Sequence, residues 1–196
     1  MLQRGWNEQG LYYVNDITPM GGETFIDTFF KEQKEFIGFL QQQGQVSYSQ
    51  NVEMFLSKTL LLSCSSYFER RITDAISDYA KKVSNADEAL ISLVRNKAIE
   101  RQYHTYFQWS GDNPSVRPFF AMFGSTIRDS SKQALRDSDL SDASKAFLEL
   151  GNLRNLLVHE NFLNYPLEKT ADEIYQLYCA ALRFIIYIEN TLNLIP

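Results

Sequence analysis

Apolar residues recur at steps of three and four along most of the chain, which is the period of an amphipathic helix. The same pattern is expected to continue past the third helix through the aromatic residues at 103–109, while turn residues predict a tight turn at 111–114 and a polar loop at 130–139. The predicted helices are, in chain order, 24–43, 51–82, 86–99, 118–123, 140–159 and 171–192.

Capping residues fix the expected helix starts. Asn51 is expected to cap the second helix, and Asn85 with Glu88 to form a capping pair for the third. Either Asp139 or Ser141 is expected to cap the fifth helix. No run of alternating residues competes for a strand, so the sequence predicts an all-α, antiparallel multi-helix bundle.

The first part of the chain differs from the rest. Residues 1–22 contain glycine, proline and aromatic residues without helical spacing, which is typical of an extended arm. We therefore expect a short N-terminal arm over 1–22 and one helical domain over 23–196.

Composition narrows the class of protein. The chain has 196 residues, 19 Lys and Arg against 24 Asp and Glu, a net charge of −5 and a pI near 5.1. This balance argues against proteins that coat duplex DNA through many phosphate contacts. Two distant cysteines, Cys64 and Cys179, with only two histidines, predict neither disulfides nor a metal site. With no apolar run long enough to cross a membrane and no signal peptide, we expect a cytoplasmic protein without a cofactor.

A short segment near the end of the fifth helix carries the candidate chemistry. On a helical wheel of about 100° per residue, three leucines form an expected core stripe. Arg154, Asn155 and His159 fall on the arc expected to face away from that core. The three leucines are Leu153, Leu156 and Leu157.

The three polar residue types suit metal-free cleavage of RNA. Histidine transfers protons near neutral pH, and the arginine fork fits a phosphate and its developing negative charge. Asparagine can orient the ring or hold a substrate oxygen. A structural alternative also fits, because a histidine in the last turn of a helix interacts favourably with the helix dipole. With ten arginines and two histidines in the chain, such spacing also arises readily by chance.

Residues 153–159 resemble the Arg-x4-6-His motif of the HEPN superfamily, in which a polar residue such as Asn155 follows the arginine. The resemblance covers roughly residues 50–192. Further segments resemble the RiboL-PSP-type branch of that superfamily, namely 107–113, 119–124, 149–151, 158–162, 167–170 and 173–178.

The resemblance implies a helical bundle that dimerises so that two motif helices line one cleft. It further implies a metal-independent endoribonuclease, often part of a toxin–antitoxin or anti-phage system. Arg154 would stabilise charge on the scissile phosphate, His159 would transfer the proton, and Asn155 would position them. The products would be a 2′,3′-cyclic phosphate and a 5′-hydroxyl. Phe147 and Leu148 extend apolar surface toward the motif and fit a homodimer.

Expected partners are therefore single-stranded or loop RNA, a second copy, and an antitoxin or other neighbouring-gene protein, but neither a membrane nor duplex DNA. The family also contains inactive members, so a non-catalytic interaction or scaffold module is the alternative function.

Other polar residues have simpler interpretations. Residues 69–71 are expected on a solvated helix face, with the alternative that Glu69 or Arg70 orients Arg154. His104 and the aromatic residues around it are expected to pack in the core rather than stack RNA bases. The carboxylates at 137, 139 and 142 are interpreted as helix-capping residues.

Overall fold

The computed structural model describes residues 23–160 and 162–193. Within these residues the regular structure is helical, apart from one antiparallel bridge between Gln108 and Ser115. The all-α prediction is confirmed. The predicted N-terminal arm, residues 1–22, lies outside the described residues.

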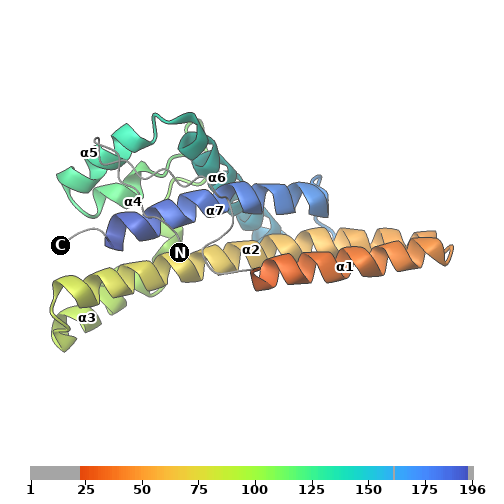
Figure 1. The fold of residues 1–196 in the computed structure, drawn as a ribbon, viewed down its shortest axis with the longest axis horizontal. Coiled ribbons are helices and arrows are strands. Elements are labelled where there is room, and N and C mark those ends of the chain that lie inside the picture. The colour runs from red at the N-terminus through yellow and green to blue at the C-terminus, as the bar shows by residue number, and fades with distance from the viewer. Residues whose placement is uncertain (1–22, 161, 194–196) are drawn as a thin grey trace, which may run out of the picture.

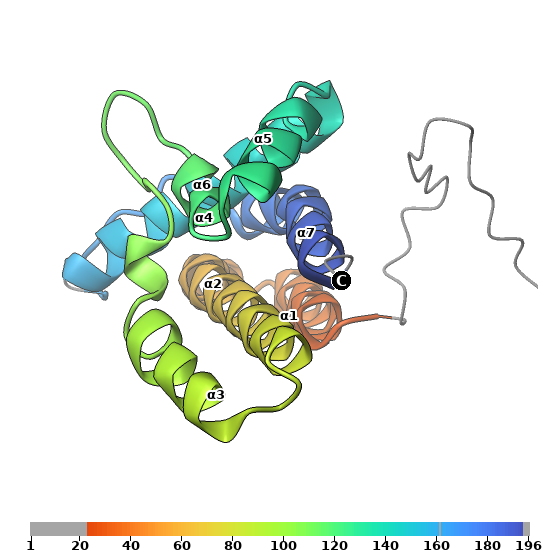
Figure 2. The ribbon, with the colours of Figure 1, turned by 90° about the vertical axis from the view of Figure 1, so that its left-hand side faces the viewer.

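The helices form a bundle around the longest of them, α2, which α1 and α7 flank (Figure 1). Seen end-on, α6 crosses against α7, α3 lies beside α2, and α4 and α5 lie in front of α6 (Figure 2). A short π-helical turn, Arg95–Ile99, and a 3-10 turn, Tyr103–Thr105, follow α3. The helices are α1 Phe25–Gln42, α2 Val46–Val83, α3 Glu88–Val94, α4 Arg117–Ala121, α5 Ser125–Ala134, α6 Ser138–His159 and α7 Ala171–Asn193.

The core lies where α2, α6 and α7 meet. Helix α7 is amphipathic over its whole length, so its apolar face is buried against both neighbours. The largest fully buried side chains at this junction are aromatic: Phe68 of α2 stacks on Tyr178 of α7, with ring centroids 5.4 Å apart, and Phe147 of α6 contacts Phe184 at 5.2 Å. Such aromatic pairs contribute beyond the area they bury.

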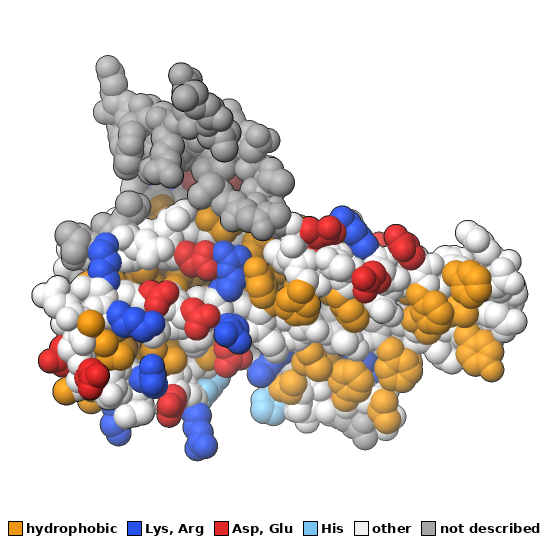
Figure 3. All heavy atoms as spheres, turned by 60° about the horizontal axis from the view of Figure 1, so that its bottom comes forward, with side chains coloured by type: hydrophobic (Ala, Val, Ile, Leu, Met, Phe, Trp, Pro, Cys, Tyr) orange, Lys and Arg blue, Asp and Glu red, His pale blue; other side chains and the backbone are white. Residues whose placement is uncertain are grey.

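The α1–α2 hairpin extends past the end of α7 (Figure 1). Its tip is a short turn in which Gly44 has a φ of +72°, a conformation that favours glycine. Because the turn is this short, α2 begins at Val46, and the predicted start at Asn51 is wrong. Hydrophobic side chains gather on the exposed face of this hairpin (Figure 3). They include Phe36, Phe39, Val46, Tyr48, Met54 and Phe55.

Two predictions around α3 are wrong. Asn85 and Ala86 have positive φ and form the turn, so Asp87 caps α3 instead and accepts a hydrogen bond from the Leu90 amide at 2.8 Å. The helical pattern also does not continue through 103–109. That segment leaves the helix at Arg101, which has a φ of +58°, because its aromatic residues turn inward to the core.

Two further predictions fail at the α5–α6 junction. The predicted loop at 130–139 is largely helix, because Ile127 and Ser131 form a buried stripe one turn apart that holds α5 on the bundle. The cap of α6 is Asp137, which accepts hydrogen bonds from the amides of Asp139 and Leu140. Asp137 thus caps the helix and Asp139 lies in its first turn, whereas Asp142 forms an exposed ion pair with Lys145 at 2.8 Å. Pro118 in the first turn of α4 and the positive φ of Gly124 also agree with the sequence pattern.

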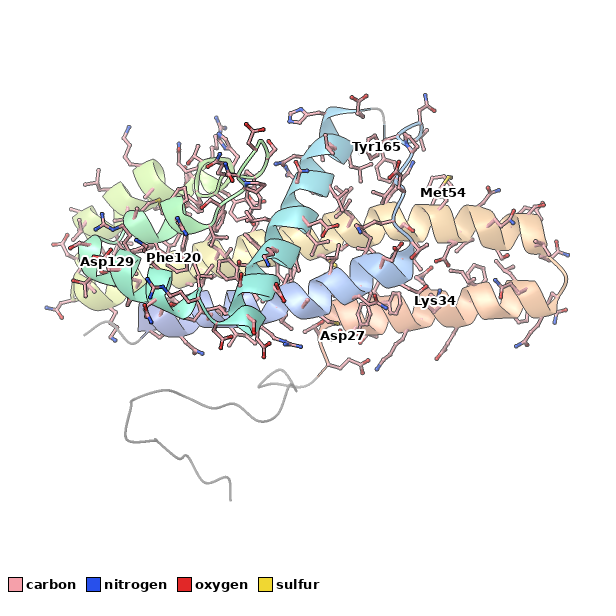
Figure 4. All side chains as sticks on the ribbon, turned by 90° about the horizontal axis from the view of Figure 1, so that it is seen from above. Asp27, Lys34, Met54, Phe120, Asp129 and Tyr165 are labelled. Carbon is pink, nitrogen blue, oxygen red and sulfur yellow. The ribbon has the colours of Figure 1, made fainter. Side chains whose placement is uncertain are left out.

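Polar contacts fix the relative positions of α1, α2 and α7. Asp27 accepts a hydrogen bond from Tyr175 at 2.8 Å, and Lys34 forms an ion pair with Asp172 at 2.7 Å; Asp27 and Lys34 are labelled in Figure 4. The half-buried Arg71 donates from Nε to Glu189 at 2.6 Å. The prediction of a solvated face for Arg71 is therefore wrong.

Candidate active site

Helix α6 carries the Arg-x4-His motif, and its buried side chains define which way the motif faces. The buried stripe runs through Ala143, Phe147, Leu150 and Leu157. Arg154 lies along this stripe and is half-buried, whereas Leu156, predicted in the core, is 44% exposed. The prediction placed the buried face of the helix at the wrong angle because it used only the leucines of the last two turns, Leu153, Leu156 and Leu157. The placement of Arg154 on the arc facing away from the core is therefore wrong.

Arg154 and Asn155 line a small cavity between α6, α2 and the 103–109 segment. Its volume is about 20 Å³, which is room for about one water molecule. Asn155 accepts a hydrogen bond from Arg154 Nη1 at 3.2 Å, so the amide holds the guanidinium at the edge of this cavity. Ser65 and Glu69 of α2 line the opposite side.

Trp109 closes the cavity by packing directly onto Gly151 of α6. A Cβ atom at position 151 would lie 2.0 Å from Trp109 Cζ3, so only glycine permits this contact. The indole Nε1 also donates to the His104 carbonyl at 3.0 Å, and the ring lies 5.4 Å from that of Phe147. The aromatic segment thus packs in the core as predicted, but it also forms one wall of the cavity. His104 is exposed and lines the cavity, so its predicted core packing is wrong.

Two charges of opposite sign, Arg154 and Glu69, line the cavity without forming an ion pair with each other. In the described part of the chain no carboxylate lies within 4.0 Å of the Arg154 guanidinium, so the positive charge has no ion-pair partner. Burial raises the pKa of the Tyr103 hydroxyl, Glu69 raises this pKa further, and Arg154 lowers it. The charges of Glu69 and Arg154 therefore both act on the side of the cavity that Tyr103 forms. Glu69 is half-buried, and its predicted solvated position is wrong; the alternative, that it reaches the site of Arg154, agrees with the structure. Arg70 is exposed, as predicted, and forms an ion pair with Asp74 at 3.6 Å.

His159 ends α6 and points to solvent rather than into the cavity. Its side chain makes no hydrogen bond within the described residues, and its position is exposed. Figure 3 shows histidine side chains on a face bordered by lysine and arginine side chains. The structure therefore brings Arg154 and Asn155 together but leaves His159 on a different side of the same helix, within one chain.

A buried lysine that the sequence reasoning missed positions the end of the motif helix. Lys58 of α2 is 1% exposed and donates from Nζ to the carbonyls of Phe162, at 2.7 Å, and Leu163, at 3.1 Å. It thereby anchors the loop that follows His159. A signal was present, because Lys58 lies one helical turn before the buried Leu61, on the same side of α2.

The described residues contain neither a cluster of metal ligands nor a membrane-spanning helix. No group of three or more His, Cys, Asp or Glu side chains lies close enough together to hold a metal ion. None of the described helices has the length and apolarity needed to span a lipid bilayer.

A helical bundle with an Arg-x4-His motif at the end of α6 is the arrangement of the HEPN class. The family model RiboL-PSP-HEPN matches residues 27–194, and the chain belongs to this family. The match begins well before residue 50, where the sequence resemblance was expected to start, so nearly all of α1 lies within it. No curated protein and no solved structure matches the chain.

Proposed function

We propose that this protein is a metal-independent endoribonuclease in which Arg154, Asn155 and His159 act on a scissile phosphate. The observation that carries the proposal is the Arg154 guanidinium, held by Asn155 at a cavity edge with no carboxylate partner in the described chain, on the motif helix of the family. A permanent cation without a partner suits the charge that develops on phosphate oxygens.

The reaction is an internal transfer at phosphorus. The ribose O2′ attacks the adjacent phosphorus, the O2′–P bond forms, the P–O5′ bond breaks, and a 2′,3′-cyclic phosphate remains. The 2′-hydroxyl loses its proton and O5′ gains one, and His159 is the residue that transfers a proton near neutral pH. Arg154 stabilises the negative charge on the non-bridging oxygens, while Asn155 positions its guanidinium. Single-stranded or loop RNA is the substrate class, because its backbone can reach the required geometry.

The geometry of α6 supports a homodimer as the active form. Arg154 and His159 are separated by about 140° around the helix and about 7.5 Å along it, so one phosphate is reached more easily by residues of two copies. Leu156 and Val158, 44% and 46% exposed, supply apolar surface beside the motif. Phe147 and Leu148, which were expected to extend apolar surface toward the motif, are buried inside a single chain, so that prediction is wrong.

Cleavage of total RNA in EDTA tests the function. Wild type should cut, His159→Ala should lose about 10²–10⁴ in rate, and Arg154→Ala about 10²–10³. Arg70→Ala is the matched control, because it removes an exposed arginine of α2 outside the site and should cleave like wild type. Equal cleavage by all four proteins would refute the proposed site.

Mixing two inactive variants tests the dimer. A heterodimer of Arg154→Ala with His159→Ala contains one intact Arg154 and one intact His159 in different chains, so mixing should restore part of the activity. Failure to restore activity, or a monomer by light scattering at micromolar concentration, would contradict a shared cleft. Expression of the active protein should also slow cell growth, as a toxin or defence ribonuclease would, whereas the double variant should not.

A second candidate function is a non-catalytic interaction module, which the exposed aromatic residues of the α1–α2 hairpin favour. It predicts a stable complex with a neighbouring-gene protein that survives His159→Ala but not substitution of Phe39 and Tyr48 by serine. Loss of the complex in a folded His159→Ala variant would count against it.

A further inference from the structure

A second, larger pocket lies between α4 and α5, and none of its lining residues lines the cavity beside Arg154. Its volume is about 420 Å³, within the range of about 300–1,000 Å³ that small-molecule sites occupy. Figure 4 shows Phe120 and Asp129, which both line it, near one another at this end of the molecule. Below it is called the α4–α5 pocket.

The charge of this region is opposite to that of the whole chain. Residues 115–136 carry four cationic side chains and one acidic one, a net charge of +3 in a chain of −5. Three of the cations, Arg117, Arg128 and Lys132, line the α4–α5 pocket. A cationic pocket on an acidic protein selects for an anionic ligand, because the rest of the surface repels it.

Two of these cations are available to a ligand. Within the described residues neither Arg117 nor Lys132 forms an ion pair, and both are exposed. Arg128 differs, because it donates from Nε and Nη2 to the two oxygens of Asp129, at 3.0 and 3.4 Å. This exposed pair occupies part of the Asp129 carboxylate, which retains capacity to accept further hydrogen bonds.

Apart from Ser115 and Ser131, the remaining lining is apolar, and a simple inorganic anion would not use that apolar surface. Pro118 and Leu135 contribute hydrophobic surface next to the cations, and the buried Phe120 forms the floor. A ligand that matches all of these features has a phosphate, hydroxyl or amine donors, and a flat, weakly polar ring.

We propose that the α4–α5 pocket binds a nucleoside phosphate. Arg117 and Lys132 bind the phosphate oxygens, Asp129 accepts a hydrogen bond from a ribose hydroxyl or a base amine, and Pro118 and Leu135 contact the base. This unit occurs both in free nucleotides and in RNA strands. The site is separate from the Arg154 motif, so binding here does not depend on the proposed cleavage.

Binding by the full-length protein tests the proposal with two probes. The first is AMP, followed by calorimetry, and the second is a fluorescent 2′-O-methyl oligoribonucleotide, which lacks the nucleophile for cleavage. The pocket variant is Arg117→Glu/Lys132→Glu, and the matched control is Arg70→Glu/Lys145→Glu, whose cations lie outside the pocket on exposed helix faces. Both variants carry a net charge of −9, so a general charge effect acts equally on them.

Oligonucleotide affinity should fall about tenfold or more in the pocket variant and stay within about twofold of wild type in the control. The slope of log affinity against log salt should also decrease in magnitude by about 1.4 in the pocket variant. AMP binding that is lost with the same variant identifies a free nucleotide as sufficient, whereas oligonucleotide binding alone identifies an RNA strand. The milder variant Arg117→Gln/Lys132→Gln should also lower the oligonucleotide affinity and reduce the magnitude of the salt slope.

Three results would overturn the proposal. These are equal loss of affinity in the pocket and control variants, unchanged affinity in the pocket variant, and displacement of the oligonucleotide by inorganic phosphate as effectively as by AMP. The last would reduce the pocket to a general anion site.

Discussion

The contact between Trp109 and Gly151 gives the sharpest stability prediction. In Gly151→Ala the new Cβ would lie 2.0 and 2.2 Å from two ring carbons of Trp109, so the indole must move. Overpacking of this kind destabilises by about 1–3 kcal/mol, and alanine in a helix returns up to about 1 kcal/mol relative to glycine. We therefore expect the free energy of unfolding to fall by about 1–2 kcal/mol.

Gly38→Ala is the matched control. Gly38 also lies inside a helix, α1, but a Cβ there would meet no atom within 4 Å. It should raise the free energy of unfolding by up to about 1 kcal/mol through helix propensity alone. Urea unfolding followed by far-ultraviolet circular dichroism measures both variants against wild type.

A double-mutant cycle isolates the contact. Trp109→Leu should cost less stability in the Gly151→Ala background than in wild type, because the clash has already displaced the ring. If Gly151→Ala is as stable as Gly38→Ala, or if the two substitutions add independently, the packing of Trp109 on Gly151 is refuted.

Three more predictions concern polar groups that are buried or half-buried. Glu189→Gln should destabilise by about 1–3 kcal/mol in urea unfolding because it weakens the half-buried pairing with Arg71, whereas Asp78→Asn, which affects an exposed pair, should cost less than about 0.5 kcal/mol. Burial raises the pKa of Asp27, but hydrogen bonds from Thr24 and Tyr175 more than offset this and hold it below 3.8. At pH 7 wild type should therefore have a larger free energy of unfolding than Asp27→Asn. This difference should disappear as the pH falls from 3.8 through the lower pKa of Asp27 in the folded protein, and acid titrations of both proteins measure it. Ser65→Ala should leave stability within about 0.5 kcal/mol of wild type, because the buried Ser65 hydroxyl has no partner in the described chain; a larger loss in thermal melts would reveal a hydrogen bond there.

Periodicity predicted every α-helix except α5, but it did not predict the direction of the motif. The long apolar faces of α2 and α7 were recognised because burial dictates their spacing. The orientation of Arg154 was missed because it depends on Leu150, one turn earlier, and Phe147, two turns earlier, which set the inward face of α6. Each of these helix starts contains several short polar side chains that can accept the capping hydrogen bond. The prediction therefore chose Asn85 over Asp87, and Asp139 or Ser141 over Asp137.

Contacts between distant segments were beyond the sequence pattern altogether. Lys58 reaches carbonyls more than one hundred residues away, and Trp109 meets Gly151 only after the chain has left α3 and turned back. The motif itself was visible because Arg154, Asn155 and His159 are close in sequence. The cavity that gives Arg154 its surroundings was not, because α2 and the 103–109 segment supply most of it.

The chemistry of the cut ends tests the central claim most directly. A labelled oligoribonucleotide incubated with wild-type protein in EDTA should yield fragments that end in a 2′,3′-cyclic phosphate and begin with a 5′-hydroxyl. His159→Ala should yield neither. Fragments with 3′-hydroxyl and 5′-phosphate ends, or cutting that persists undiminished in His159→Ala, would contradict the proposed role of Arg154 and His159.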